Sequence, residues 1–295
     1  MLIAQKNKKK MRLLLIITVL LCVFGTTFQE TAYAKSVMPV YVSIVPQKYF
    51  VEKIGGALVN VSVMVQPGAS PATYEPKPRQ MVDLSKTKIY FAIGVPFEKV
   101  WLKKIAAANP KMLVVHTQEG IEKKPMKADK PYGIKDPHIW LSPTLVKIQA
   151  RNILNALVAV DQANKPVYEA GYKKFIIEIE NLDVELKGVF TGKRKKMKFI
   201  VFHPSWGYFA GEYGLKQIPV EIEGKDPKPA DLQRLIKHAK KLGVKVIFVQ
   251  PQFSVANASV IAQAIGGQIA FADPLALNWP DNLRQVAAKF KAASR

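Results

Sequence analysis

Short apolar runs alternate with amphipathic stretches along the chain from residue 40 onward. The apolar runs of the first part are rich in β-branched and aromatic residues, and we expect them to be strands: 40–45, 59–65, 89–93 and 112–115. The stretches with helical spacing between them are 49–54, 81–84 and 97–108. Alternation of strand and helix is typical of a parallel sheet with crossover helices, so this part is predicted to be an α/β lobe of about four βα units.

The middle of the chain, from Ser142 to Phe190, carries no strand signal. A first helix is predicted over 145–159, and Pro166 opens a longer one, because proline suits a first helical turn. One apolar stripe runs along the longer helix: Phe175, Ile179, Leu182, Leu186 and Val189. A helix of about 25 residues is roughly 37 Å long, which predicts a stiff rod between two lobes.

The alternation resumes after this helix. Strands are predicted over 199–202, 217–222, 244–249 and 268–271, and helices over 206–213, 229–242, 254–265 and 283–293. The predicted fold class is therefore α/β, with two lobes of about four βα units each, parallel sheets, and one long rigid helix that joins them. We expect an N-terminal lobe over 35–163, the connecting helix over 164–192 and a C-terminal lobe over 193–295.

The N-terminal segment, residues 1–34, has the pattern of a cleaved signal peptide. Basic residues between Lys6 and Arg12 precede an apolar run from Leu13 to Phe24, which is shorter than the ~20 residues of a spanning helix. Ala32-Tyr33-Ala34 is a small-x-small cleavage site, with the cut expected after Ala34. We therefore expect a periplasmic protein; Cys22, the only cysteine, would be removed, which excludes disulfides and thiolate metal sites.

The net charge is +22, a value that can indicate nucleic-acid binding. The lysines are scattered, however, and the densest basic cluster, Lys193 to Lys196, lies at a predicted connection between elements. No aromatic–basic recognition motif accompanies them. We expect no nucleic-acid partner, and interpret the charge as a solvated basic surface.

Three residues carry the candidate chemistry: His138, His203 and Asp273. Each has a proline immediately beside it, and His203 and Asp273 follow predicted strands of the second lobe. Ligands of parallel α/β sheets bind beyond the carboxyl ends of the strands, so these side chains are expected to face one cleft. Two imidazoles and a carboxylate suit zinc or another borderline divalent ion. Taken singly, each histidine also fits a hydrogen-bonded structural role, and an Asp before Pro fits a turn.

The sequence resembles the solute-binding proteins of ABC transporters that import zinc or manganese. The resemblance covers nearly the whole chain after residue 34 and rests on these motifs: Pro67-Gly68-Ala69-Ser70-Pro71, Tyr74-Glu75-Pro76, Asp136-Pro137-His138-Ile139-Trp140-Leu141-Ser142-Pro143, Phe202-His203-Pro204-Ser205, Gln250-Pro251-Gln252-Phe253-Ser254 and Asp273-Pro274-Leu275. It implies two α/β lobes with the metal between them, delivery to a membrane permease, and a monomer. It also implies that His138, His203 and Asp273 occupy three of four ligand positions. A histidine at 203 resembles the zinc pattern, with manganese the less favoured ion.

The first ligand position of the family is occupied here by Ala72, whose methyl group cannot coordinate a metal. Three explanations stay open. The site keeps three protein ligands and adds water or a second carboxylate oxygen; a neighbour, Glu75 or His116, replaces the missing histidine; or the site has lost tight metal binding and serves another ligand or a protein partner.

An open coordination position is also a property of catalytic zinc, so a zinc-dependent hydrolase is a further alternative. It would need a general base, for which Glu75 or Glu221 is available. The sequence has neither a Gly-rich phosphate loop nor a G-x-S-x-G nucleophile elbow. We therefore expect a binding protein and not an enzyme.

Overall fold

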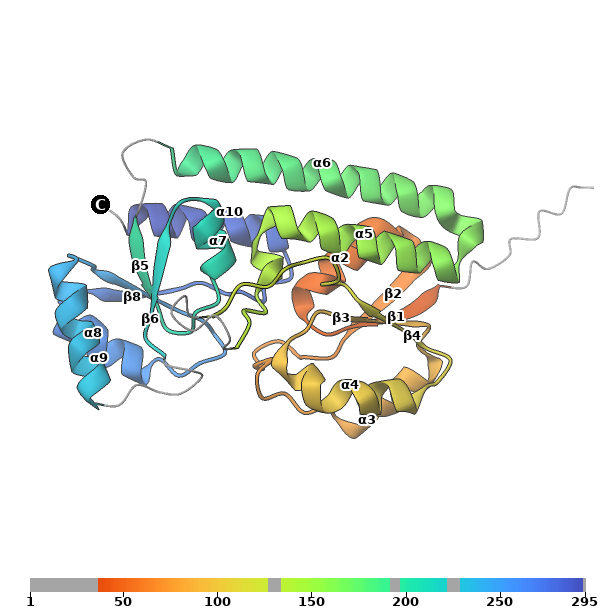
Figure 1. Ribbon diagram of the computed structural model, residues 1–295, viewed down its shortest axis with the longest axis horizontal. Helices are drawn as coiled ribbons and strands as arrows, with labels where there is room; N and C mark the ends of the chain where they lie inside the picture. Colours follow the sequence, from red (N-terminus) through yellow and green to blue (C-terminus); the bar gives the residue numbers. More distant parts are fainter. Residues whose placement is uncertain (1–36, 127–133, 192–196, 222–228, 294–295) are drawn as a thin grey trace, which may run out of the picture. The chain divides into compact units, whose positions relative to one another are not determined.

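The computed structural model describes residues 37–126, 134–191, 197–221 and 229–293. They contain two four-stranded sheets, each wholly parallel, with helices packed on both faces (Figure 1). The predicted signal peptide, residues 1–34, lies outside the described residues. Among the helices of the described part, none has the length and apolar character that crossing a bilayer requires.

The first sheet has the strand order β2-β1-β3-β4. Its strands are β1 (Met38–Val42), β2 (Val59–Val63), β3 (Ile89–Ala92) and β4 (Leu113–His116). Helices α2 (Val45–Gly55) and α5 (Pro143–Val160) cover one face, and α3 (Pro78–Asp83) and α4 (Pro96–Ala108) lie on the other (Figure 1). Strand β1 ends before the predicted residue 45 because Pro46, in the first turn of α2, starts the helix there.

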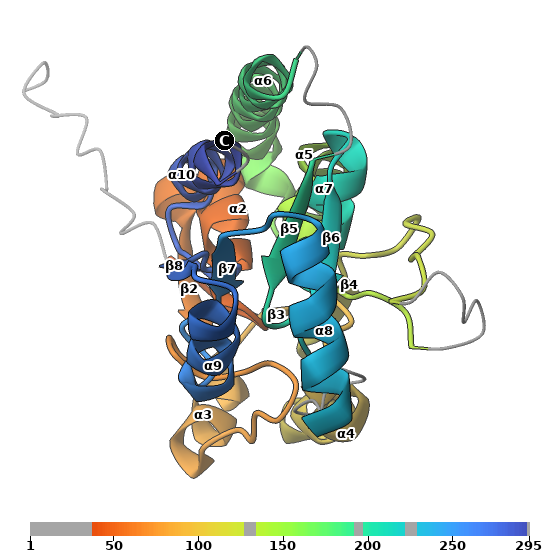
Figure 2. The same cartoon turned by 90° about the vertical axis from the view of Figure 1, so that its left-hand side faces the viewer.

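The second sheet has the matching order β6-β5-β7-β8. Its strands are β5 (Lys198–Val201), β6 (Lys216–Pro219), β7 (Val246–Val249) and β8 (Gln268–Phe271). Its helices are α7 (Gly207–Glu212), α8 (Pro229–Lys241), α9 (Ala256–Ala264) and α10 (Trp279–Ala292). Helices α8 and α9 lie on the face opposite α10 (Figure 2). Helix α10 begins before the predicted residue 283, because Pro280 occupies its first turn.

Side chains alternate between the two faces of β5, so the second sheet packs against a different apolar cluster on each face. Phe199 and Val201 join a large apolar cluster with α10, whereas Ile200 and Phe202 join a smaller cluster with α8 and α9. Successive side chains of a strand point to opposite faces, so a continuously apolar strand is buried on both sides. The apolar run 199–202, which showed no alternation, is thereby accounted for.

Helix α6 (Lys165–Val189) is the long connecting helix, 25 residues in length. It buries one stripe: Tyr168, Phe175, Ile179, Leu182 and Leu186. This stripe packs on α2 and α5 of the first lobe and on α10 of the second (Figure 1). The predicted architecture of two parallel α/β lobes and one long helix is confirmed.

The lobes also meet directly around Trp279, the first residue of α10. Its ring lies 5.2 Å from that of Phe50 in α2 and 6.4 Å from that of Phe175 in α6, measured between centroids. Its indole Nε1 donates to the Trp140 carbonyl at 2.7 Å, and the Trp140 Nε1 donates to the Pro274 carbonyl at 2.7 Å. The large apolar cluster is consequently continuous from the first sheet through α6 to α10. Relative motion of the lobes therefore has to preserve or repack this junction.

Candidate metal site

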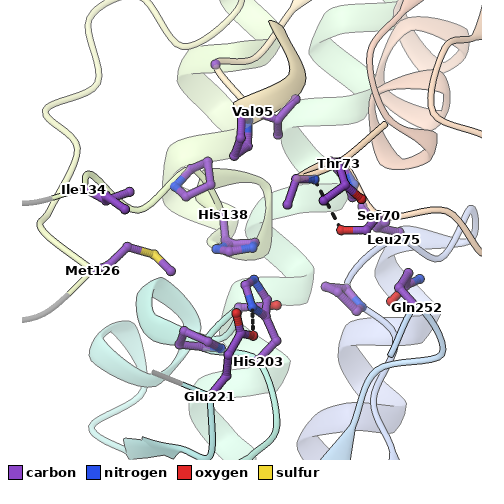
Figure 3. A pocket seen from close by; sticks show the side chains of 18 of the residues that line it. Ser70, Thr73, Val95, Met126, Ile134, His138, His203, Glu221, Gln252 and Leu275 are labelled. Atoms are coloured by element: carbon purple, nitrogen blue, oxygen red, sulfur yellow. Dashed lines mark hydrogen bonds and ion pairs between the residues drawn. The ribbon is translucent and has the colours of Figure 1, made fainter. Parts of the chain in front are cut away.

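Two histidines from different parts of the chain face each other in one pocket. The rings of His138 and His203 have centroids 5.2 Å apart and lie at 70° to each other (Figure 3). They line a cavity of about 780 Å³. His203 follows β5, whose neighbours β6 and β7 lie on opposite sides of it. This reversal of strand order is the place where doubly wound sheets bind ligands.

Asp136 orients His138. Its Oδ1 accepts a hydrogen bond from the His138 backbone N–H at 2.9 Å and lies 2.7 Å from the imidazole Nδ1. A carboxylate has no proton to donate, so Nδ1 carries the proton and Nε2 keeps its lone pair for a metal. The side chain is buried, and burial lowers the pKa of His138, while the neighbouring Asp136 charge acts in the opposite direction. The environment thus favours the neutral imidazole, the form that binds metals.

Glu221 orients His203 in the same way as Asp136 orients His138. Glu221 follows β6, and its Oε2 lies 2.5 Å from His203 Nδ1 (Figure 3). Gln250 holds the backbone of His203 on both sides: its Oε1 accepts from the His203 N–H at 3.1 Å, and its Nε2 donates to the His203 carbonyl at 2.6 Å. Phe253 stacks on the imidazole at 5.0 Å and 20°. The ring is fixed in orientation, and its Nε2 is left for a ligand.

Glu221→Gln is expected to weaken zinc binding by about tenfold, because partners of ligand histidines typically contribute 10- to 100-fold in affinity. The amide still reaches His203 Nδ1 but no longer carries the charge that makes the imidazole a stronger donor. Competition with a fluorescent zinc chelator would measure the change. Glu180→Gln, a control at the exposed ion pair with Lys147, should leave affinity within twofold, and equal losses in both variants would contradict the assignment.

Asp273 lies next to the pocket without lining it. Its Oδ1 accepts from the Leu275 backbone N–H and from Gln252 Nε2, both at 2.9 Å. The first of these bonds closes an Asx turn over Pro274, as Asp136 does over Pro137. Pro274, Leu275 and Gln252 are lining residues, so Asp273 supports the pocket wall in this geometry.

The first-lobe residues considered at or near the vacant ligand position lie in different places. Ala72 lines the pocket with its neighbours Ser70, Pro71 and Thr73. Glu75 is exposed and does not line the pocket. His116, at the end of the edge strand β4, is also exposed and does not line the pocket; its Nδ1 lies 3.3 Å from Gln118 Nε2. Across the described residues, no three or more His, Cys, Asp or Glu side chains gather as a metal would require. Among these residues the structure brings together His138 and His203, with the carboxylates of Asp136 and Glu221 bonded to them.

The orienting roles of Asp136, Glu221 and Gln250 were not anticipated from the sequence. Asp136 is two residues before His138, a spacing that allows an Asx turn and was a usable signal. Glu221 was considered only as a general base, and its carboxylate is instead bonded to His203. Glu221 and Gln250 reach His203 from β6 and β7, so only the strand order reveals them.

The chain has two lobes, each built on a parallel sheet, that are joined by one long helix and enclose a pair of imidazoles oriented by carboxylates. These features define a substrate-binding protein of the metal-binding class. The chain belongs to the family described as zinc-uptake complex component A, periplasmic, whose sequence profile matches residues 40–293. It is 28% identical over 237 residues to the high-affinity zinc uptake system protein ZnuA of Bacillus subtilis (strain 168), covering 76% of this chain and 74% of that protein.

Two further comparisons extend this result. A zinc-bound crystal structure of a ZnuA deletion mutant superposes with a TM-score of 0.83 at 45% identity, covering 88% of this chain and 98% of the other. The manganese ABC transporter substrate-binding lipoprotein PsaA of Streptococcus anginosus is 27% identical over 211 residues, covering 68% of this chain and 67% of that protein. The family assignment made from the sequence motifs is confirmed.

Proposed function

We propose that this protein captures a divalent transition metal, zinc before manganese, between its lobes and delivers it to the membrane permease of an ABC importer. The observation that carries the proposal is the pair of imidazoles, His138 and His203, each with Nδ1 held by a carboxylate and Nε2 left for a metal. Nitrogen ligands favour zinc over the harder manganese ion, which prefers oxygen. The zinc uptake proteins among the relatives support the same choice.

His138 and His203 are the proposed protein ligands, with Asp273 as a third. Asp273 would use its Oδ2, because Oδ1 is engaged by Leu275 and Gln252. Glu75 and His116 remain weaker candidates, since neither lines the pocket. Ala72 lines the pocket and offers no donor, so the remaining position is open among the residues that the structure describes.

A binding role is proposed in preference to catalysis. Of the two bases considered, the Glu221 carboxylate is bonded to His203, and Glu75 lies outside the pocket lining. A general base has to reach the reacting proton, so neither placement favours hydrolysis. We also propose that the protein acts in the periplasm after cleavage behind Ala34, and that it acts as a monomer. Its proposed parts are an N-terminal lobe over 35–163, the connecting helix over 164–192 and a C-terminal lobe over 193–295.

Metal loading tests the function. Chain purified without residues 1–34, stripped with a chelator and reloaded, should retain about one equivalent of zinc after desalting, measured by elemental analysis. The expected stoichiometry follows from the single pair of facing imidazoles. Retention below about a tenth of an equivalent of any transition metal would overturn the proposal and favour the alternative of a degenerate site with another ligand or a protein partner. Generic ester and phosphate substrates should show no zinc-dependent turnover.

Acid should release the metal. Only neutral imidazoles bind zinc, and the lowered pKa of His138 keeps this ligand neutral to below its ordinary 6.5. Affinity is therefore expected to be nearly constant above pH 7 and at least tenfold weaker at pH 5 than at pH 7.5. Titration calorimetry in matched buffers measures this, with circular dichroism confirming that the fold persists. A binding constant unchanged across that range would exclude histidine ligands.

A further inference from the structure

Met126 brings a thioether sulfur into the pocket that holds the two histidines. It lines the cavity together with His138 and His203. Figure 3 shows its side chain extending from the loop between β4 and His138 toward the two imidazoles. Among the described residues that line this pocket, no other side chain contains sulfur. The pocket therefore offers a soft donor beside two imidazole nitrogens, and the capture of zinc gives that donor no role.

The backbone on which Met126 lies is held in place by hydrogen bonds. Its N–H donates to the Ile134 carbonyl at 2.8 Å, and the Asp136 N–H donates to the Lys124 carbonyl, also at 2.8 Å, so the two segments pair antiparallel. Asp136, at one end of this pairing, is the residue that orients His138. The same pair of segments thus carries both the thioether and the carboxylate that positions the first-lobe imidazole.

Two different side chains are available as a third donor beside the imidazoles. The carboxylate of Asp273, next to the pocket, is the third ligand proposed for zinc, and its oxygen is a hard donor. The thioether of Met126 is a soft donor, of the kind that selects Cu(I). Imidazole nitrogen suits both zinc and copper. The same pair of histidines can consequently serve two ions, each with its own third ligand.

The surroundings of the histidines also suit Cu(I). Zinc binds four ligands, and Ala72 offers no donor, so zinc needs a water or a second carboxylate oxygen here. Cu(I) accepts fewer ligands than zinc, and two imidazoles with one thioether satisfy it. Apolar walls give a bound water few hydrogen-bond partners, so they favour an ion that is satisfied by protein donors alone. Much of the pocket wall is apolar: Val95, Trp140, Phe253 and Leu275.

We propose that the site also binds Cu(I), with His138 and His203 as ligands through Nε2 and Met126 as the third ligand through Sδ. The ion binds and leaves as Cu(I), without a change of oxidation state. This proposal rests on the same imidazole pair as the proposed capture of zinc and goes beyond it, because it adds a second cargo. Met126 then determines the affinity for copper, and Asp273 determines that for zinc.

Competition with the Cu(I) chelator bathocuproine disulfonate, under anaerobic conditions, tests the proposal. The wild-type chain should withdraw about one equivalent of Cu(I) from the chelator. Met126→Leu keeps the size and apolar character of the side chain but lacks the sulfur, so it should weaken Cu(I) binding about tenfold or more and leave zinc binding within about twofold. Asp273→Asn should do the reverse. Met81→Leu, a change outside the pocket lining, is the matched control and should alter neither affinity.

X-ray absorption at the copper edge gives a second measurement. The Cu(I)-loaded wild type should show a sulfur neighbour of the metal, and Met126→Leu should lack it. Since the chain has no cysteine after residue 34, such a neighbour can come only from a methionine. A wild-type spectrum with nitrogen and oxygen neighbours alone would contradict the sulfur ligand.

The outcomes separate this proposal from the zinc capture on which it rests. Zinc retained while Cu(I) stays with the chelator would overturn the copper site and leave zinc capture standing. Cu(I) bound equally well by wild type and Met126→Leu, or equal losses in Met126→Leu and Met81→Leu, would exclude Met126 as a ligand. Cu(I) bound without any zinc would support the copper site and overturn zinc capture. Neither ion bound would remove both.

Discussion

His138→Ala is expected to abolish measurable zinc binding, with a loss of at least about 100-fold in affinity, equivalent to about 2.8 kcal/mol. His138 is the first-lobe side chain whose imidazole faces His203 in the pocket, and Ala72 contributes no donor. Removing it leaves one imidazole in the pocket and, among the described residues that line it, no first-lobe imidazole or carboxylate ligand that links the lobes through the metal. Isothermal titration with zinc would measure the loss.

Two other histidines serve as controls for this result. His116→Ala removes the exposed imidazole at the end of β4, and His238→Ala removes an exposed one on α8. Neither lines the pocket, so each should leave affinity within twofold. A loss in His116→Ala as large as in His138→Ala would show that His116 is a ligand. A mere two- to threefold loss in His138→Ala would mean that the first lobe does not hold the metal through this residue.

Trp279→Ala is expected to lower the free energy of unfolding by about 3–5 kcal/mol, the range for large aromatic side chains deleted from a core. The indole is 1% exposed and packs against both Phe50 and Phe175, while its Nε1 donates to the Trp140 carbonyl. Its loss leaves a cavity where both lobes and α6 meet, and a buried carbonyl without its donor. Urea-induced unfolding followed by far-ultraviolet circular dichroism would measure the change.

Matched variants separate the contributions at this junction. Trp279→Phe retains most of the ring packing and loses the hydrogen bond, so a loss of about 1–3 kcal/mol is expected. Val184→Ala, at a position of α6 that is 69% exposed, should change the unfolding free energy by less than about 0.5 kcal/mol. If Trp279→Ala costs less than about 1 kcal/mol, the two lobes do not depend on a shared core here.

The shared core also bears on how the lobes move. Trp140 follows His138 by two residues and bonds through Nε1 to the Pro274 carbonyl, next to Asp273. The same tryptophan therefore ties the loop that carries the first-lobe histidine to the loop that carries the candidate carboxylate. Closure on a ligand is expected to be a small adjustment at the pocket rim, because a large hinge motion would break these bonds and the packing of Trp279.

Much of the fold could be predicted from the sequence because each element carries its own signal. Apolar runs of β-formers marked the strands, and one stripe of four-and-three spacing marked α6. Errors were confined to ends, as in β1 and α10, where a proline in the first turn decided the boundary. A periodic pattern reports the type of an element more surely than its last residue.

The sequence by itself determined the fold class and the family, and it singled out the two histidines as candidate ligands, because these depend on local periodicity and on contiguous motifs. Only the tertiary structure decided how the site is built. The Asp136 carboxylate accepts a hydrogen bond from His138 Nδ1, and the Glu221 carboxylate, from the end of another strand, accepts one from His203 Nδ1. Asp273 accepts a hydrogen bond from the Leu275 backbone N–H, and neither Glu75 nor His116 lines the pocket. The reason is physical: strand order brings Glu221 to 2.5 Å from His203 Nδ1, and no local pattern along the chain encodes that contact. The contact of Asp136 with His138, two residues apart, depends on a turn that the sequence permits but does not require.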